Sequence, residues 1–131
     1  MDNFAEAFPK IDFSTLIFVL SAISPENHVK SLKKIFDQMD SNSYFYFRDY
    51  GLYDLAQLRL AARKDAKLAE NFYLKTDGTR VYYFDEKYLG TLLKEVGFEI
   101  ITLETHYRVV KNKKRDLDMK RVWVQSICKK A

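Results

Sequence analysis

Two apolar segments that flank one amphipathic segment constrain the fold of this chain more than any other feature. Residues 13–20 form an almost continuous apolar run, and residues 44–47, after a polar turn at residues 40–43, form a shorter one. Such runs are typical of strands buried on both faces of a parallel sheet. Between them a helix is predicted to open with Ser24 as N-cap and Pro25 as its first residue, and its apolar face comprises Val29, Leu32, Ile35, Phe36 and Met39. This order predicts a parallel pair of strands with a right-handed crossover.

The remaining elements are predicted to end in an antiparallel hairpin. They are a helix over residues 53–67, a hairpin of residues 72–74 and 81–84, a helix over residues 85–97, and strands over residues 98–107 and 121–127. Asp77 and Gly78 supply the turn of the first hairpin. Asp85 caps the helix that follows, and Gly97 ends it. The charged residues 111–118 suit an exposed turn between the last two strands.

Length and composition indicate one small domain over residues 1–131, in which 47% of residues are hydrophobic. The net charge of +4 suits contact with an anionic polymer, and it equally suits a set of solvated basic faces. The single cysteine forms no internal disulfide, and the two histidines lack metal-ligand spacing, so we expect a reducing compartment and no metal site. The longest apolar run is too short to span a bilayer, and the N-terminus, with Asp2 and Glu6, lacks a signal-peptide pattern. We expect a cytoplasmic protein without membrane contact, with nuclear and mitochondrial locations left open.

Glycine is scarce, and its distribution limits what the chain can bind. The glycines are Gly51, Gly78, Gly90 and Gly97, so the first fifty residues contain none. A loop whose backbone approaches a cofactor closely needs glycine, because a side chain would hold the ligand away. We therefore expect no glycine-rich cofactor loop in this chain.

The densest group of functional residue types is the string Phe47-Arg48-Asp49-Tyr50-Gly51-Leu52-Tyr53-Asp54. It sets a charge pair and two aromatic rings beside a glycine, where the second strand gives way to a helix. Residues 71–73 and 77–80 add more aromatic and polar groups further along the chain. Polar groups gathered at such a corner are costly in a core and useful in a site.

Residues 16–24, 47–54 and 71–84 resemble the methyltransferase-like family that makes 3-methylcytidine in the tRNA anticodon loop, and most closely its serine-tRNA-type members. Residues 121–126 are similar to the family's last strand, so the resemblance covers residues 11–128. It implies an α/β fold, the C-terminal half of a class I (Rossmann-like) methyltransferase dependent on S-adenosylmethionine (SAM), with a mixed sheet and a terminal antiparallel hairpin. It also implies SAM as cofactor, tRNA as substrate and seryl-tRNA synthetase as a possible protein partner.

The departures from the family pattern concern the cofactor side. The family's N-terminal region, with its glycine-rich motif and cofactor-binding acidic residues, has no counterpart here. We therefore expect an incomplete SAM pocket, in a chain that is a fragment, a truncated product, or half of a domain that a second chain completes. In the family's strand order, residues 13–20 adjoin the missing first strand. We predict that these residues lie at the rim of the sheet or pair with a second chain.

The resemblance gives the string a chemical role in methyl transfer, which we assign to Asp49 and Tyr50. Cytosine N3 attacks the sulfonium methyl with its own lone pair, so the step needs no strong base but creates positive charge on the ring. Asp49 either stabilises that charge or has a structural role, as an ion pair with Arg48 or as a helix cap. Tyr50 and Tyr53 either stack on the flipped base or pack in the core. Arg48 either binds phosphate or holds Asp49, and Asp54 fits a cap of the next helix.

The residues expected to contact the cofactor are predicted by the resemblance alone. It implies that Ile17 and its neighbours Phe18, Leu20 and Ser21 line the SAM pocket, with Ser21 near the substrate. Taken without the resemblance, Ile17 and Phe18 fit core positions better than a pocket.

The expected substrate contacts lie in the second half of the chain. Asn71, Tyr73 and Arg80 form either a flap over the RNA or a well-satisfied hairpin. Four cations at helical spacing either track phosphates or form a solvated helix face, and they are Arg59, Arg63, Lys64 and Lys67.

Two functions of different class fit these observations. The first is the substrate-side half of an RNA methyltransferase, catalytic only when the missing half is present. The second is a noncatalytic module that has kept a tRNA- or protein-binding surface and lost the cofactor site. A chain without any stable function is the third reading.

Overall fold

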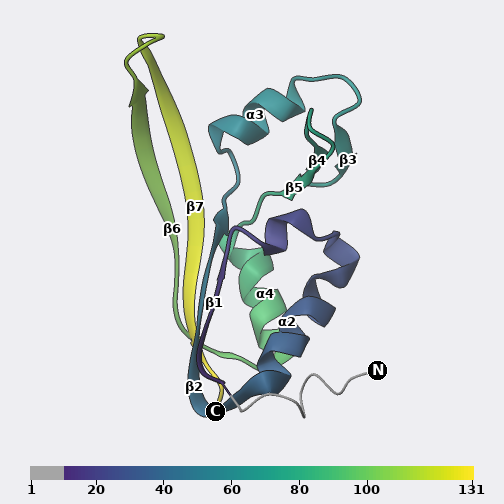
Figure 1. Ribbon diagram of the computed structural model, residues 1–131, viewed down its shortest axis with the longest axis vertical. Coiled ribbons are helices and arrows are strands. Elements are labelled where there is room, and N and C mark those ends of the chain that lie inside the picture. The colour runs from purple at the N-terminus through teal and green to yellow at the C-terminus, as the bar shows by residue number, and fades with distance from the viewer. Residues whose placement is uncertain (1–10) are drawn as a thin grey trace.

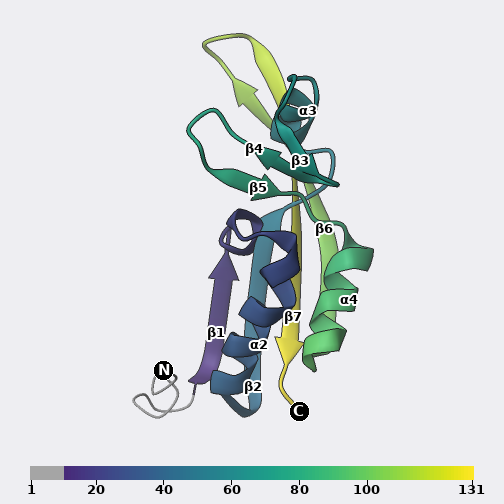
Figure 2. The ribbon, with the colours of Figure 1, turned by 90° about the vertical axis from the view of Figure 1, so that its right-hand side faces the viewer.

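The computed structural model describes residues 11–131, which form a four-stranded mixed sheet with two helices packed on one face (Figure 1). The strands lie in the order β1 (Ile11–Ile17), β2 (Met39–Tyr50), β7 (Leu117–Lys129) and β6 (Glu99–Asn112). The helices α2 (His28–Gln38) and α4 (Glu86–Val96) lie side by side over the sheet (Figure 2). The charged N-terminal residues Asp2 and Glu6 lie outside the described residues. Within residues 11–131, no helix combines the length and apolarity that crossing a membrane requires.

The strand, helix, strand unit at the start of the chain is confirmed, because β1 pairs with β2 in parallel. β1 ends at Ile17, earlier than expected, and Phe18 takes a left-handed backbone conformation with φ 54°. Two short 3-10 turns follow, η1 (Leu20–Ala22) and η2 (Pro25–Asn27), before α2 begins. Pro25 opens η2 as predicted, but the Ser24 side chain makes no capping hydrogen bond. Its hydroxyl oxygen instead accepts a hydrogen bond from Arg80 Nη1 at 2.6 Å.

The prediction that residues 13–20 are buried on both faces is wrong. Phe13 is 61% exposed and Ile17 46% exposed, whereas Leu16, on the opposite face, packs against the core. Both large helices cover that one face, so the other face of the sheet is bare of helices among residues 11–131 (Figure 1). We call this bare side the outer face. The predicted rim position is confirmed, because among the described strands β1 pairs only with β2.

The second strand is longer than predicted. β2 begins at Met39 directly after α2, and residues 40–43 are part of the strand instead of a separate turn. Asn42, with φ 65°, is its irregular residue, and its N–H donates to the carbonyl of Lys130 at 2.6 Å. The irregular residue thus lies where the chain just beyond β7 supplies a hydrogen-bond partner.

The main core lies between the inner face of the sheet and the two helices. Phe45 and Phe47 of β2 are fully buried there, together with Leu32 of α2 and Leu93 of α4. Phe45 stacks on Phe98 with ring centroids 4.9 Å apart. Burial of side chains of this size, at roughly 1.5–3 kcal/mol each, supplies the main driving force for folding of the unit.

A second, smaller layer follows β2 and consists of α3 (Leu55–Ala61) and an antiparallel sheet of β3 (Lys67–Ala69), β4 (Phe72–Leu74) and β5 (Arg80–Tyr82). The β4–β5 hairpin is confirmed, and Asp77 Oδ1 accepts the Thr79 N–H at 2.9 Å in its turn. The predicted helix over residues 53–67 is too long. Ala66 is buried in a second core with Leu60, and this packing outweighs helix propensity. Of the four cations expected at helical spacing, only Arg59 therefore lies on the helix.

The end of the chain agrees with the predicted terminal hairpin. Asp85 Oδ1 caps α4 by accepting the Tyr88 N–H at 2.6 Å. Gly97 ends the helix with φ 117°, a conformation that favours glycine. The strands β6 and β7 are longer than expected and extend past the sheet as a two-stranded ribbon (Figure 1).

Candidate functional site

The carboxyl ends of β1 and β2 bring residues 18–21 and 49–54 together. Because the two strands are parallel, both chain segments leave the sheet at the same edge. The Phe18 N–H donates to the Arg48 carbonyl at 2.8 Å, and the rings of Phe18 and Tyr50 lie 4.8 Å apart between centroids. Ligands in open α/β sheets bind at such strand ends, so this corner is the candidate site.

Asp49 is fully buried at this corner, and both of its carboxylate oxygens hold backbone amides. Oδ2 accepts the Ser21 N–H at 2.9 Å, and Oδ1 accepts the Tyr50 N–H at 2.8 Å. Burial raises the pKa of Asp49 to about 6, against the opposing effect of the hydrogen bonds from Ser21 and Tyr50. These contacts fix the η1 turn against the end of β2. The predicted role of Asp49 opposite a cytosine ring stays a prediction.

Arg48 lies on the outer face of the sheet, since neighbouring strand residues point to opposite sides. Its Nη2 and Nε donate to Gln125 Oε1 at 2.7 and 3.2 Å, and Tyr46 Oη donates to the same oxygen at 3.1 Å. The alternatives in which Arg48 holds Asp49, or pairs with it, are therefore wrong. A phosphate contact of Arg48 stays a prediction.

Two aromatic residues of the corner have backbone conformations that side chains rarely adopt. Phe18 has φ 54° and Tyr53 has φ 70°. The Gln57 Oε1 accepts the Tyr53 N–H at 2.5 Å and so holds that conformation, while the Tyr53 side chain is 69% exposed. Each such residue costs of order 1–3 kcal/mol, and such strain is concentrated at functional sites.

Asp54 has a larger structural role than the sequence indicates. Its Oδ2 caps α3 by accepting the Ala56 N–H at 2.9 Å, as expected. Its Oδ1 accepts from Arg121 Nε and from the Val122 N–H, both at 2.8 Å. The Asp54 hydrogen bond raises the pKa of Arg121 above its usual value. Sequence reasoning missed Arg121 because nothing local links the last strand to residue 54.

The predicted flap residues are brought near one another, but they do not share one surface. Tyr73 is only 5% exposed and packs against Tyr83 with ring centroids 5.8 Å apart, as in the well-satisfied hairpin alternative. Asn71 Oδ1 accepts from Gln57 Nε2 at 3.5 Å. Arg80 is exposed and lies over the Phe72 ring, 5.6 Å from its centroid. Roles of Asn71, Tyr73 and Arg80 in RNA binding stay predictions.

The expected cofactor residues divide into two pairs. Ile17 and Phe18 are 46% and 38% exposed and form an apolar wall at the end of β1, of the kind on which an adenine ring packs. Leu20 is fully buried in the main core, and Ser21 is buried with its N–H held by Asp49. Ile17 and Phe18 therefore fit one wall of a SAM pocket, whereas a SAM contact of Leu20 or Ser21 stays a prediction. Within residues 11–131, no group of three or more His, Cys, Asp or Glu side chains has an arrangement that suits a metal ion.

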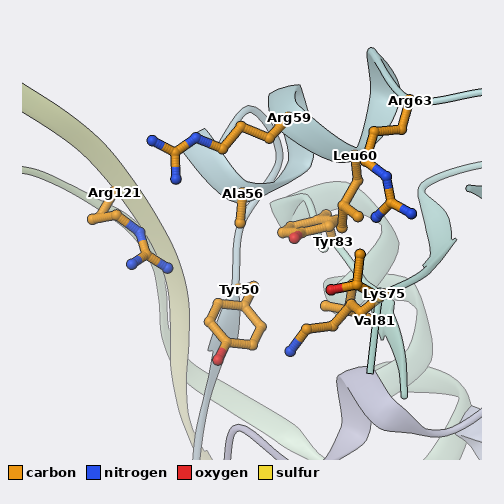
Figure 3. A pocket seen from close by; sticks show the side chains of 10 residues that line it. Tyr50, Ala56, Arg59, Leu60, Arg63, Lys75, Val81, Tyr83 and Arg121 are labelled. Carbon is orange, nitrogen blue, oxygen red and sulfur yellow. The ribbon is translucent and has the colours of Figure 1, made fainter. Parts of the chain in front are cut away.

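A pocket of about 310 Å³ opens next to Tyr50, between α3, the β4–β5 hairpin and β7 (Figure 3). Tyr50 and Tyr83 supply its rings. Its charged lining residues are all cations, and they are Arg59, Arg63, Lys75 and Arg121. Arg59 and Arg63 thus line one concave surface, although only Arg59 lies on the helix. Lys67 instead pairs with Glu70 away from the pocket.

Comparison with solved structures shows the fold class. A SAM-dependent methyltransferase of Methanosarcina mazei superposes with a TM-score of 0.69 at 20% identity, over 95% of this chain and 62% of that one. A methyltransferase of Clostridium acetobutylicum gives a TM-score of 0.63 at 14% identity, over 94% and 59% of the two chains. The chain has the α/β fold, with a mixed sheet, of class I SAM-dependent methyltransferases.

Sequence comparison is more specific. The human tRNA N(3)-cytidine methyltransferase METTL6 is 42% identical over 116 residues, which are 88% of this chain and 40% of that protein. The Saccharomyces cerevisiae tRNA(Thr) (cytosine(32)-N(3))-methyltransferase is 38% identical over 117 residues, 89% and 18% of the two chains. O-methyltransferase 3 of Dictyostelium discoideum is 41% identical over 115 residues, 88% and 26%. No protein-family model matches. The chain is thus similar to a segment of tRNA cytidine-N3 methyltransferases and spans less than half of the length of these relatives.

Proposed function

We propose that this chain is the substrate-side part of a SAM-dependent tRNA methyltransferase that forms 3-methylcytidine in the anticodon loop. The observation that carries the proposal is 42% identity to a tRNA N(3)-cytidine methyltransferase across 88% of the chain. The class I fold agrees with it, and so does the place of the residue 47–54 string at the carboxyl end of a parallel strand.

In this proposal the chain's residues position the target base and stabilise its charge. SAM, when bound, supplies the methyl group on its sulfonium. Tyr50, which contacts both Phe18 and Tyr83, presents its ring to the base at the mouth of the pocket. Asp49 accepts the Tyr50 N–H, so its buried carboxylate lies at the backbone of this corner, where negative charge favours the cation that forms on the ring. Ser21 and Tyr50 are held by the same carboxylate, so the cofactor side and the substrate side of the corner are fixed together.

The exposed edge of β1 and the outer face fit a surface that the rest of the domain completes. None of the strands described within residues 11–131 pairs with the outer edge of β1, and Phe13 and Ile17 are exposed beside it. We propose that a cofactor-binding half, on the same polypeptide or on a second chain, adds strands at this edge. Seryl-tRNA synthetase is the proposed protein partner and the cytoplasm the proposed location.

A noncatalytic tRNA- or protein-binding module is the second candidate function, and the exposure of Ile17 and Phe18 favours it. In that case the residues that were expected to line a cofactor pocket face solvent in the working protein. Calorimetric titration of the isolated chain with SAM and with tRNA tests both candidates. We expect binding of tRNA and no binding of SAM at millimolar concentration. Tight SAM binding by the monomeric chain contradicts the substrate-side proposal. Absence of tRNA binding also contradicts it, and leaves only the protein-binding form of the noncatalytic module.

A further inference from the structure

The pocket next to Tyr50 has the composition of an anion site. Its lining residues include four cations and no carboxylate, and the side chains come from three separate parts of the chain. Arg59 and Arg121 extend from α3 and β7 at one side of the hollow, while Lys75 reaches across its floor toward Tyr50 (Figure 3). Like charges that converge on a concave surface repel one another, so the arrangement is most favourable when an anion lies between them.

The cations of the pocket are available for such an anion. Arg59, Arg63 and Lys75 have no side-chain ion pair with another residue of 11–131. Arg121 uses Nε for Asp54, and its remaining guanidinium N–H groups are free of that contact. Because Asp54 is fully buried and also caps α3, it fixes the guanidinium of Arg121 at the pocket wall. One of the four cations is therefore preorganised.

The two tyrosine rings of the pocket determine which chemical group can bind beside the anion. Tyr50 is half-buried between Phe18, at the strand-end corner, and Tyr83, inside the pocket. A base stacked on Tyr50 therefore lies close to the strand-end corner. A phosphate attached to the same nucleotide lies close to the four cations. Aromatic rings beside guanidinium groups are the combination with which proteins hold single-stranded nucleotides.

From this geometry we propose that the pocket binds one nucleotide of the RNA. Its phosphate lies between Arg59, Lys75 and Arg121, and its base lies against Tyr50. Arg63 serves the next phosphate at the rim. The inference rests on the proposed function and deepens it, because it states which cations hold the phosphate of the nucleotide whose base lies against Tyr50. A second expectation follows: the RNA affinity attributable to this pocket falls steeply with salt.

The test uses the whole chain, with cytidine 5′-monophosphate and cytidine as probes. The ring signals of Tyr50 and Tyr83 are followed by NMR during each titration. We expect the monophosphate to shift both signals at concentrations where cytidine leaves them unchanged. The pocket variant Arg59→Gln/Lys75→Gln should weaken monophosphate binding by about tenfold or more. The control variant Lys30→Gln/Lys94→Gln removes the same charge from exposed sites on α2 and α4, and should change binding by less than about twofold.

Two results overturn the inference. One is an equal response to cytidine and to its monophosphate. The other is an equal loss of affinity in the pocket and control variants, which indicates only general charge attraction. Circular dichroism of each variant shows that the fold is kept, so that a lost response reflects the pocket. A failure of methylation in a completed domain leaves this titration unaffected, so the inference and the proposed function are tested separately.

Discussion

Arg121 Nε lies 2.8 Å from Asp54 Oδ1, and this partly buried contact joins the last strand of the sheet to the first turn of α3. The same oxygen accepts the Val122 N–H, and the other oxygen caps the helix. One carboxylate thus fixes the wall of the pocket, the start of α3 and the register of β7. The corner next to Tyr50 therefore depends on a residue that makes no contact with the pocket itself.

Asp54→Ala should lower the free energy of unfolding by about 2–4 kcal/mol, because it leaves Arg121 and the Val122 N–H without a partner and removes a helix cap. Urea denaturation followed by circular dichroism measures the change. Asp77→Ala is the matched control, since Asp77 is an exposed carboxylate whose contacts lie within its own turn. Equal effects of the two substitutions contradict the structural role of Asp54.

The stability of the chain should depend on the ionisation of Asp49. The pKa of Asp49 is about 6 in the folded chain, above its usual value of 3.8, because burial disfavours the charged form. The folded state therefore holds the proton more tightly, and stability falls as pH rises from about 4 to about 6. This rise in pKa corresponds to roughly 3 kcal/mol in the free energy of unfolding, which is lost when Asp49 ionises.

Asp49→Asn removes this titration, so its stability relative to the parent chain should improve between pH 4 and pH 7. Asp77→Asn is the control of opposite sign, because hydrogen bonds from Thr79 lower the pKa of Asp77 and the parent chain loses this contribution as pH falls below about 4. Denaturant unfolding at a series of pH values gives both curves. If the difference in unfolding free energy between Asp49→Asn and the parent chain stays constant with pH, Asp49 is not buried as described.

Gly51→Ala should destabilise the chain by about 1–3 kcal/mol through overpacking. A Cβ at position 51 lies only 2.7 Å from Val122 Cγ1 and 3.2 Å from Val124 Cγ2. Val122→Ala removes the closer atom, so the double variant should recover part of the loss relative to the sum of the single variants. The thermal midpoints of the three variants measure the coupling, and simple additivity contradicts it.

The outer face should tolerate charge and the inner face should not. Phe13→Lys and Ile17→Lys change exposed side chains, so the fold should persist and self-association through the bare edge should decrease. Leu16→Lys buries a charge against the core and should abolish cooperative unfolding. Light scattering and circular dichroism distinguish the three variants. Unfolding of the chain by Phe13→Lys shows that this face is covered in solution.

Local sequence signals predicted those parts of the fold whose cause is local. The parallel crossover follows from the apolar runs and their spacing, and the ends of α4 follow from Asp85 and Gly97. The string around Asp49 lies at a strand end, as the apolar pattern up to Phe47 predicts. Residue types and their order are enough to predict an element when the contacts that form it lie within a few positions along the chain.

Long-range contacts account for what the sequence did not predict. α3 ends early because Ala66 packs into a separate core, and Arg48 turns from Asp49 to Gln125 because that partner lies on the neighbouring strand. The exposure of Ile17 depends on which face α2 covers, and the apolar pattern of β1 is the same for either face. The basic pocket unites residues of α3, the β4–β5 hairpin and β7, and no segment of the sequence shows it alone.

We propose that these residues supply the substrate side of a tRNA cytidine-N3 methyltransferase. The most direct test replaces the matching segment of human METTL6 with residues of this chain, and then measures transfer of labelled methyl groups to tRNA together with SAM binding. We expect the chimera to bind SAM and to form 3-methylcytidine, and we expect Tyr50→Ala in the chimera to lower the rate strongly while SAM binding persists. A chimera that folds and binds both SAM and tRNA, yet transfers no methyl group, contradicts the account and leaves the noncatalytic module.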